Sequence, residues 1–254
     1  MANENTNFFN RGGVATVDQA TFDVGLRAHM VRVYNYMASG LALSGIVALA
    51  LFNIEGLAAV FFDIRMVAGT PRVAGLNALG WVAILAPLGL LLLVSFRAEK
   101  MSVTSIQAVY WTVTALMGVS LSLLLFRYTG ASVARTFFIT AAAFGALSLY
   151  GYTTKRDLSA FGKFLFMGVI GLILAGIVNM IWPSGTMSFI ISAAGVLIFS
   201  GLIAYDTQKI KEQYADAWGS DVQEKVAIFG ALSLYLDFVN LFQFLMAFIG
   251  EKRE

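Results

Sequence analysis

The chain has 254 residues, of which 59% are hydrophobic, 13% are charged and none is cysteine. Soluble proteins carry about 25% charged residues, so this composition disfavours a soluble enzyme or a disordered chain and indicates an integral membrane protein. The absence of cysteine excludes disulfides, thiolate metal sites and cysteine nucleophiles. A net charge of +2 without a basic block offers no surface for nucleic acid.

Long uncharged intervals mark the expected membrane crossings, since a helix needs about 20 apolar residues to span the hydrocarbon core. In chain order the intervals are 33–54, 73–96, 101–126, 136–154, 164–205 and 226–250, and the last of them contains one acid, Asp237. The fifth is long enough for two helices, and Pro183 divides it because proline lacks a backbone donor and disfavours helix at the residue before it. The runs lack the alternation of barrel strands. The pattern predicts an all-α integral membrane protein with seven transmembrane helices.

Two polar segments flank the first crossing. Residues 1–27 lack the basic start and short apolar core of a cleavable signal, so we expect a retained polar tail before a transmembrane domain of residues 28–250. Residues 53–72 contain only a short apolar run, which predicts either a loop with an interfacial turn or a re-entrant segment.

Eleven of the 17 Lys and Arg residues fall on the side of the N-terminus and six on the other. This bias predicts a cytoplasmic N-terminus.

Two acids lie within the expected membrane spans. Asp206 follows twenty uncharged residues in the sixth span, and Asp237 lies near the middle of the seventh. A carboxylate at this depth costs several kcal/mol unless it pairs, is protonated or faces water. If the two touch, they share a proton and titrate as a pair, and once ionised they offer oxygen ligands to a hard cation such as Ca2+. Alternatively, a protonated pair only locks two helices together.

Two arginines lie at helix ends on the same side as Asp206. Arg32 opens the first span and Arg97 closes the second. Either one reaches inward to hold a deprotonated Asp206, or both extend to lipid headgroups as long basic side chains do at membrane boundaries.

Other polar side chains lie close to the two acids in sequence. Asn240 follows Asp237 by three residues and so shares its helix face, where it can bond the carboxyl or line a polar path. Tyr205 and Tyr235 are each near an aspartate and either donate a phenolic hydrogen bond to it or pack elsewhere with the hydroxyl satisfied. The single histidine, His29, precedes the first span and is expected to be solvated.

The heptapeptide FGALSLY occurs twice, at 144–150 and 229–235. The flanking residues do not match at the same offset, so the repeat does not indicate a duplicated fold. We expect its small residues, Gly145 and Gly230 among them, to let helix backbones approach closely.

The residues around the two aspartates resemble a known family. AYDTQKI at 204–210 and ALSLYLDFVNLF at 231–242 are similar to the C-terminal signature of the Bax inhibitor-1 family, also called the transmembrane Bax inhibitor motif or lifeguard family. FGALSLYGYTTKRDL at 144–158 resembles the fourth span and following loop of bacterial members. With seven spans in the expected places, the resemblance covers residues 28–250.

The resemblance implies more than the residues alone. Members are similar to small Ca2+-permeable leak channels that respond to pH through two aspartates, and their C-terminal helix is central and surrounded by the other six. By motif match, Asp206 and Asp237 take the places of these aspartates, and Arg97 is the nearest match to an arginine that pairs with the first. Eukaryotic relatives restrain cell death and lower internal Ca2+ stores, whereas some bacterial relatives modulate a membrane-bound protease.

We therefore expect a pH-sensitive Ca2+ leak channel of the bacterial inner membrane, gated by Asp206 and Asp237, with Ca2+ as the transported ion and no cofactor. Phosphate loops, zinc motifs and nucleophile elbows are absent from the sequence, so we do not expect an enzyme. The alternative is a non-conducting regulator that binds a membrane partner such as a quality-control protease. In that case the aspartates set helix packing, and the N-terminal tail or the loops bind the partner.

Overall fold

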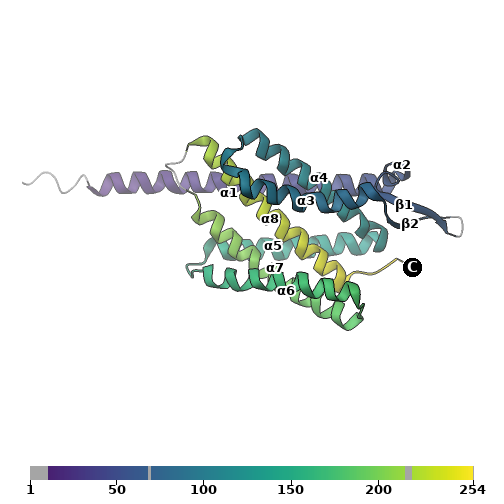
Figure 1. Cartoon of the computed structure of the whole chain (residues 1–254). Helices are drawn as coiled ribbons and strands as arrows, with labels where there is room; N and C mark the ends of the chain where they lie inside the picture. Colours follow the sequence, from purple (N-terminus) through teal and green to yellow (C-terminus); the bar gives the residue numbers. More distant parts are fainter. Residues whose placement is uncertain (1–10, 68–69, 215–218, 254) are drawn as a thin grey trace, which may run out of the picture.

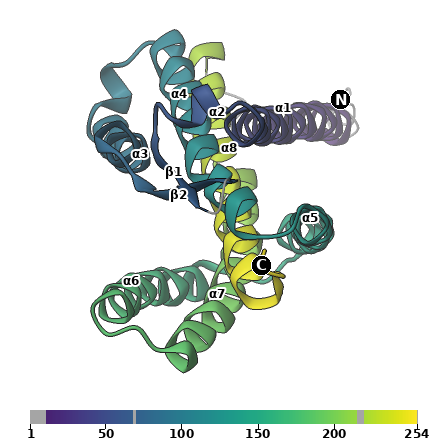
Figure 2. The ribbon, with the colours of Figure 1, turned by 90° about the vertical axis from the view of Figure 1, so that its right-hand side faces the viewer.

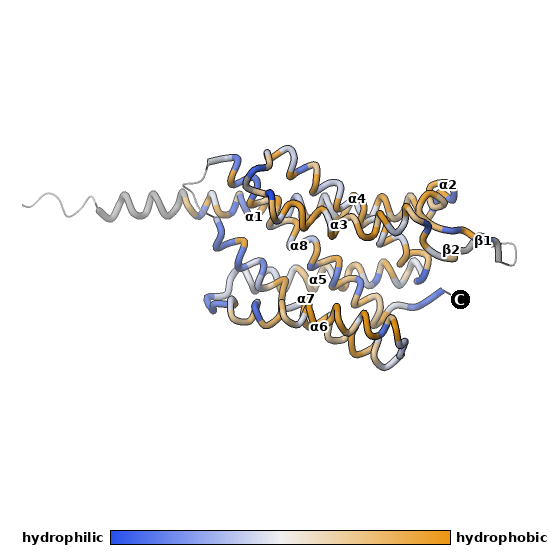
Figure 3. The backbone as a smooth tube through the Cα atoms, in the orientation of Figure 1, coloured by the Kyte–Doolittle hydropathy of each residue, from blue (hydrophilic) through white to orange (hydrophobic). Residues whose placement is uncertain are grey.

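Seven long helices form the body of the protein (Figure 1). The computed structural model describes residues 11–67, 70–214 and 219–253. The long helices are α1 (Arg11–Asn53), α3 (Ala78–Arg97), α4 (Val103–Arg127), α5 (Gly130–Thr153), α6 (Ser159–Ile181), α7 (Gly185–Glu212) and α8 (Ser220–Ile249). Each contains a segment long and apolar enough to cross a membrane. Hydrophobic residues run along the helices and hydrophilic ones gather toward the two ends of the bundle (Figure 3). The predicted all-α membrane class and the seven helices are confirmed.

The first helix is longer than the uncharged interval suggested. It begins at Arg11, whereas the span was predicted from residue 33. Charged residues mark the expected membrane boundary, but they do not stop a helix, because Arg and Lys are good helix formers. Residues 1–10 of the predicted tail lie outside the described residues.

The predicted division of the fifth interval is confirmed. α6 ends at Ile181 and α7 begins at Gly185, on either side of Pro183. The side chain of Ser184 caps the new helix by accepting a hydrogen bond from the backbone N–H of Met187 at 3.4 Å. Proline therefore ends one crossing, and the serine beside it starts the next.

The segment between the first two spans is a β-hairpin, so the predicted loop with an interfacial turn is only partly right. A short helix, α2 (Glu55–Ala58), leads into β1 (Phe62–Val67), which pairs antiparallel with β2 (Thr70–Leu76). The alternation of apolar and charged residues along β1 is the period-2 pattern of a strand. Phe62 is buried and anchors the hairpin to the bundle, and because β2 runs to Leu76, α3 begins at Ala78 instead of residue 73.

The C-terminal helix α8 is central, as predicted, and the η1 turn (Ala98–Lys100) only joins α3 to α4. α8 packs directly against α1, α4, α5 and α7, while α3 packs on the outside of α4 and α6 on the outside of α7 (Figure 2). Half of the spanning segment of α8 is buried, whereas only 6% of that of α6, the most apolar of the seven, is buried. The six helices thus surround α8 in two shells.

Small residues set the distance between several helices, as is common in membranes. Gly118 in α4 lies against the backbone of Ser44 in α1, and Gly151 in α5 lies against the backbone of Ala204 in α7. The repeated heptapeptide behaves differently at its two sites. Gly230 packs 3.1 Å from the Ile210 side chain, measured from a Cβ placed on the glycine, as expected. The same expectation is wrong for Gly145, where a Cβ would meet no atom within 4 Å.

Candidate functional site

The two acids of the spanning segments meet where α7 and α8 pack together. The Asp206 and Asp237 side chains are in hydrogen-bonding contact. Asp206 lies six residues before the end of α7 and Asp237 seventeen residues after the start of α8. α8 runs obliquely across the bundle (Figure 1).

The two carboxyls are buried to different extents. The Asp237 side chain is buried, with only 6% of the residue exposed, and Asp206 is half-buried. Oδ2 of Asp237 is buried and has no hydrogen-bond partner among the described residues. The charge of Lys209 acts on Asp206, and the Lys209 Nζ lies 5.9 Å from the centroid of the Tyr205 ring. Two ionised carboxylates have no donor between them, so the contact requires one shared proton.

The pair has the chemistry of a proton switch. While one proton is shared, the two carboxyls attract each other and hold α7 to α8. After that proton leaves, two negative charges in a poorly polarisable site repel. Within the described part of the chain no group of three or more acidic or histidine side chains could hold a metal ion. Two carboxylates supply at most four oxygens and Ca2+ takes six to eight ligands, so an ion here keeps part of its water.

None of the predicted supporting side chains bonds an aspartate. Asn240 Nδ2 donates at 2.8 Å to the carbonyl of Leu236 in its own helix. The Tyr235 hydroxyl pairs at 2.6 Å with Ser44 Oγ of α1. Tyr205 is half-buried and packs its ring against α6. These three residues therefore lie near the pair without contacting its carboxyls.

The two arginines considered as partners of Asp206 lie elsewhere. Arg97 is exposed at the end of the outer helix α3 and forms no ion pair with any described residue. Arg32 pairs with Glu224 of α8, with 2.9 Å between Nη1 and Oε2. The idea that Arg32 holds Asp206 is therefore wrong in this structure, and the pairing assigned to Arg97 by resemblance is not seen.

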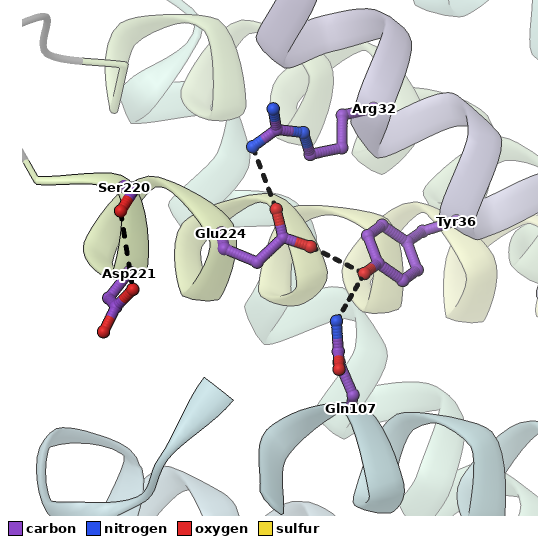
Figure 4. Close-up of polar contacts among 6 residues, drawn as sticks. All are labelled: Arg32, Tyr36, Gln107, Ser220, Asp221 and Glu224. Atoms are coloured by element: carbon purple, nitrogen blue, oxygen red, sulfur yellow. Dashed lines mark hydrogen bonds and ion pairs between the residues drawn. The ribbon is translucent and has the colours of Figure 1, made fainter. Parts of the chain in front are cut away.

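A polar network at the start of α8 was missed from the sequence (Figure 4). Glu224 accepts from Arg32 and, at 2.6 Å, from the hydroxyl of Tyr36, and that hydroxyl accepts from Gln107 Nε2 at 2.8 Å. These contacts join α1, α4 and α8. The only signal was that Arg32 and Tyr36 are four residues apart and so share a helix face. Farther out on α8, Ser220 and Asp221 make only a local contact of 3.5 Å.

A second hydrogen-bonded chain reaches the residue beside Asp206. The Tyr34 hydroxyl of α1 lies 2.7 Å from Ser148 Oγ of α5, which lies 3.1 Å from Thr207 Oγ1 of α7. Thr207 in turn donates to the carbonyl of Ile203 at 2.7 Å. α1, α5 and α7 are thereby linked on one side of the carboxyl pair.

His29 was expected to be solvated, and that expectation is wrong. Only 5% of the residue is exposed, and its ring lies 5.4 Å from that of Tyr214. Neither ring nitrogen has a hydrogen-bond partner within the described ranges. Because α1 continues as a helix outside the apolar interval, the side chain turns into the packing between α1 and the end of α7.

Comparison with known proteins agrees with this architecture. The family described as "Inhibitor of apoptosis-promoting Bax1" matches residues 26–254. An uncharacterized protein of Caulobacter vibrioides is 48% identical over 98% of this chain and all of its own length. The inner membrane protein YbhL of Escherichia coli K12 is 40% identical over 90% of this chain and 94% of its own. The extent of both matches, together with seven spanning helices around a central C-terminal one, shows that the chain belongs to the Bax inhibitor-1 family of membrane proteins.

Proposed function

We propose that the protein is a pH-sensitive cation leak channel, with Ca2+ as its main ion, in the inner membrane of a bacterium. The observation that carries the proposal is the contact of Asp206 with Asp237 inside two spanning helices. Acids at this depth are costly, and they typically mark ion pathways or proton relays. A relative of known location, the E. coli protein, is named as an inner membrane protein. The bias of basic residues favours a cytoplasmic N-terminus.

The proposed closed state is the protonated pair. A shared proton holds α7 against α8, and no arginine is required for this. When the proton leaves, repulsion between the carboxylates separates the two helices and exposes the oxygens to a partly hydrated ion. Because the proton closes the pathway, the flux rises with pH.

The rest of the pathway is proposed along α8. Ser233, Asn240 and Gln243 are half-buried polar residues at spacings of seven and three, so they lie on one side of the helix. The Asn240 side chain bonds its own helix, and the side chains of Ser233 and Gln243 have no hydrogen-bond partner among the described residues. They are available to ion-bound water when α7 moves.

The test is Ca2+ uptake into proteoliposomes at several pH values. Asp206→Asn and Asp237→Asn each remove the negative charge with little change of shape, and we expect each to flatten the pH response. Asp63→Asn, in the exposed strand β1, is the matched control and should respond as wild type does. Folding of each variant is checked by its elution as a single species in detergent.

An absence of uptake above empty liposomes at every pH, from folded protein, would contradict the channel. The second proposal, a regulator that binds a membrane protein partner, would then stand. Crosslinking in native membranes would identify the partner, and removal of residues 1–25 would test whether the N-terminal segment binds it.

A further inference from the structure

A groove lies between α1 and α5, and the bonded Tyr34 and Ser148 side chains are part of its lining. Both helices pack on α8 but not closely on each other (Figure 2), and the space between them is about 480 Å³. Its walls are largely apolar and include Met30 and Val31 of α1 and Phe144 and Leu149 of α5. Val31 is 51% and Leu149 63% exposed. Because both helices span the membrane, this groove opens toward lipid.

Gly145, one of the residues that line the groove, leaves space because it has no side chain. A Cβ on this glycine would meet no atom within 4 Å, although the other copy of the heptapeptide packs its glycine against a neighbouring helix. The volume falls within the range of about 300–1,000 Å³ that is usual for small-molecule sites. The missing side chain therefore leaves room for a bound chain of atoms.

Basic groups lie at one end of the groove. Arg27 lines it one turn before Val31, and Tyr152 lines it one turn after Leu149, which places both on the side where α5 ends. Lys211 Nζ donates to the carbonyl of Tyr152 at 2.8 Å and lies 5.2 Å from its ring centroid. Within the described residues neither basic side chain forms an ion pair. The groove thus has an apolar length and a cationic end.

We propose that this groove binds one anionic phospholipid from the adjacent leaflet. An acyl chain lies along the wall formed by Val31 and Leu149 and over Gly145, and the phosphate lies between Arg27 and Lys211. Basic pockets between transmembrane helices are suited to anionic headgroups, and the apolar wall excludes a free phosphate as the main ligand. The site does not depend on the proposed channel.

The experiment compares binding of phosphatidylglycerol and phosphatidylcholine with identical chains, by native mass spectrometry of protein released from detergent. Wild type should bind the first molecule of phosphatidylglycerol about fivefold more tightly than the first molecule of phosphatidylcholine. This factor corresponds to one basic group near an anionic lipid surface. Arg27→Gln should lower the preference, and Arg27→Gln combined with Lys211→Gln should remove it. Lys163→Gln, an exposed charge at the start of α6 on the same side, should retain it.

A second pair of variants tests the apolar part of the groove. Gly145→Phe should weaken binding of both lipids at the first site about tenfold, because the ring occupies the space of more than two buried methylenes, each contributing ~0.8 kcal/mol. Gly171→Phe in α6, also exposed and with no atom within 4 Å of its Cβ, should bind as wild type does. Equal affinity of wild type for the two lipids would overturn the proposal, as would unchanged binding by Gly145→Phe.

Discussion

The close approach of α5 to α7 predicts that one added methyl group destabilises the bundle. At Gly151 a Cβ would overlap the carbonyl of Ala204 and lie 3.0 Å from its Cα. Overpacking costs about 1–3 kcal/mol, and the upper end applies because backbone cannot rotate away. Alanine recovers roughly 1 kcal/mol of helix propensity relative to glycine. Gly151→Ala should therefore lose about 2 kcal/mol, which lowers the midpoint of thermal unfolding by roughly 4–8 °C for a chain of this size.

The matched control lies on the same helix. Gly145→Ala meets no atom within 4 Å, so only the gain in helix propensity remains, and its midpoint should rise by about 2–4 °C. Both variants are unfolded in the same detergent without added lipid. If Gly151→Ala were as stable as wild type, the close backbone contact of α5 with α7 would be refuted.

Three further changes have defined outcomes. Tyr36→Phe removes a hydrogen bond to the Glu224 carboxylate and should cost roughly 1.5–3 kcal/mol of unfolding free energy. Tyr235→Phe removes a buried bond between α8 and α1 and should cost about 0.6–1.7 kcal/mol, as for hydrogen bonds between other membrane helices. The pKa of Asp157 lies below its ordinary value because Ser159 donates hydrogen bonds to the carboxylate. A carboxyl whose pKa is lower in the folded than in the unfolded state stabilises the fold at pH above its unfolded-state pKa. This stabilisation is lost as the pH falls through the folded-state pKa. Asp157→Asn should therefore be less stable than wild type near neutral pH and as stable as wild type at a pH below both pKa values.

These three are checked by thermal unfolding in detergent. Tyr150→Phe serves as control for the tyrosine variants, because Tyr150 is 49% exposed and its hydroxyl has no partner within the described ranges. Tyrosine variants as stable as this control would show that the bonded hydroxyls do not hold the helices together. A constant difference between Asp157→Asn and wild type down to strongly acidic pH would contradict the role given to that carboxylate.

The sequence predicted the membrane spans but not how they pack together, because the protein folds in lipid. The uncharged intervals and Pro183 predicted all seven crossings, because charge is costly in hydrocarbon. Which face of a helix is buried is not encoded in the same way, since lipid tails are as apolar as leucine. α6 is the most apolar span and the least buried, whereas α8 carries an acid and is the most buried. The central place of α8 came from the family resemblance.

The polar contacts were the least predictable part. Arg32 and Glu224 are 192 residues apart, and no spacing rule connects them. The two aspartates could be singled out by their depth, but estimates from straight helices left their contact undecided, and the structure brings the two side chains together. His29 was misjudged because a helix that extends beyond the apolar interval still buries one of its faces.

The central claim is that Asp206 and Asp237 act as one proton-controlled unit, and a double-mutant cycle of Ca2+ uptake tests it most directly. Uptake into proteoliposomes is measured from about pH 5 to 8 for wild type, each Asp→Asn variant and the double variant. The account predicts that uptake by wild type rises with pH and that each single variant loses this response as fully as the double variant does. Independent, additive effects of the two changes, or a pH response that survives in the double variant, would contradict it.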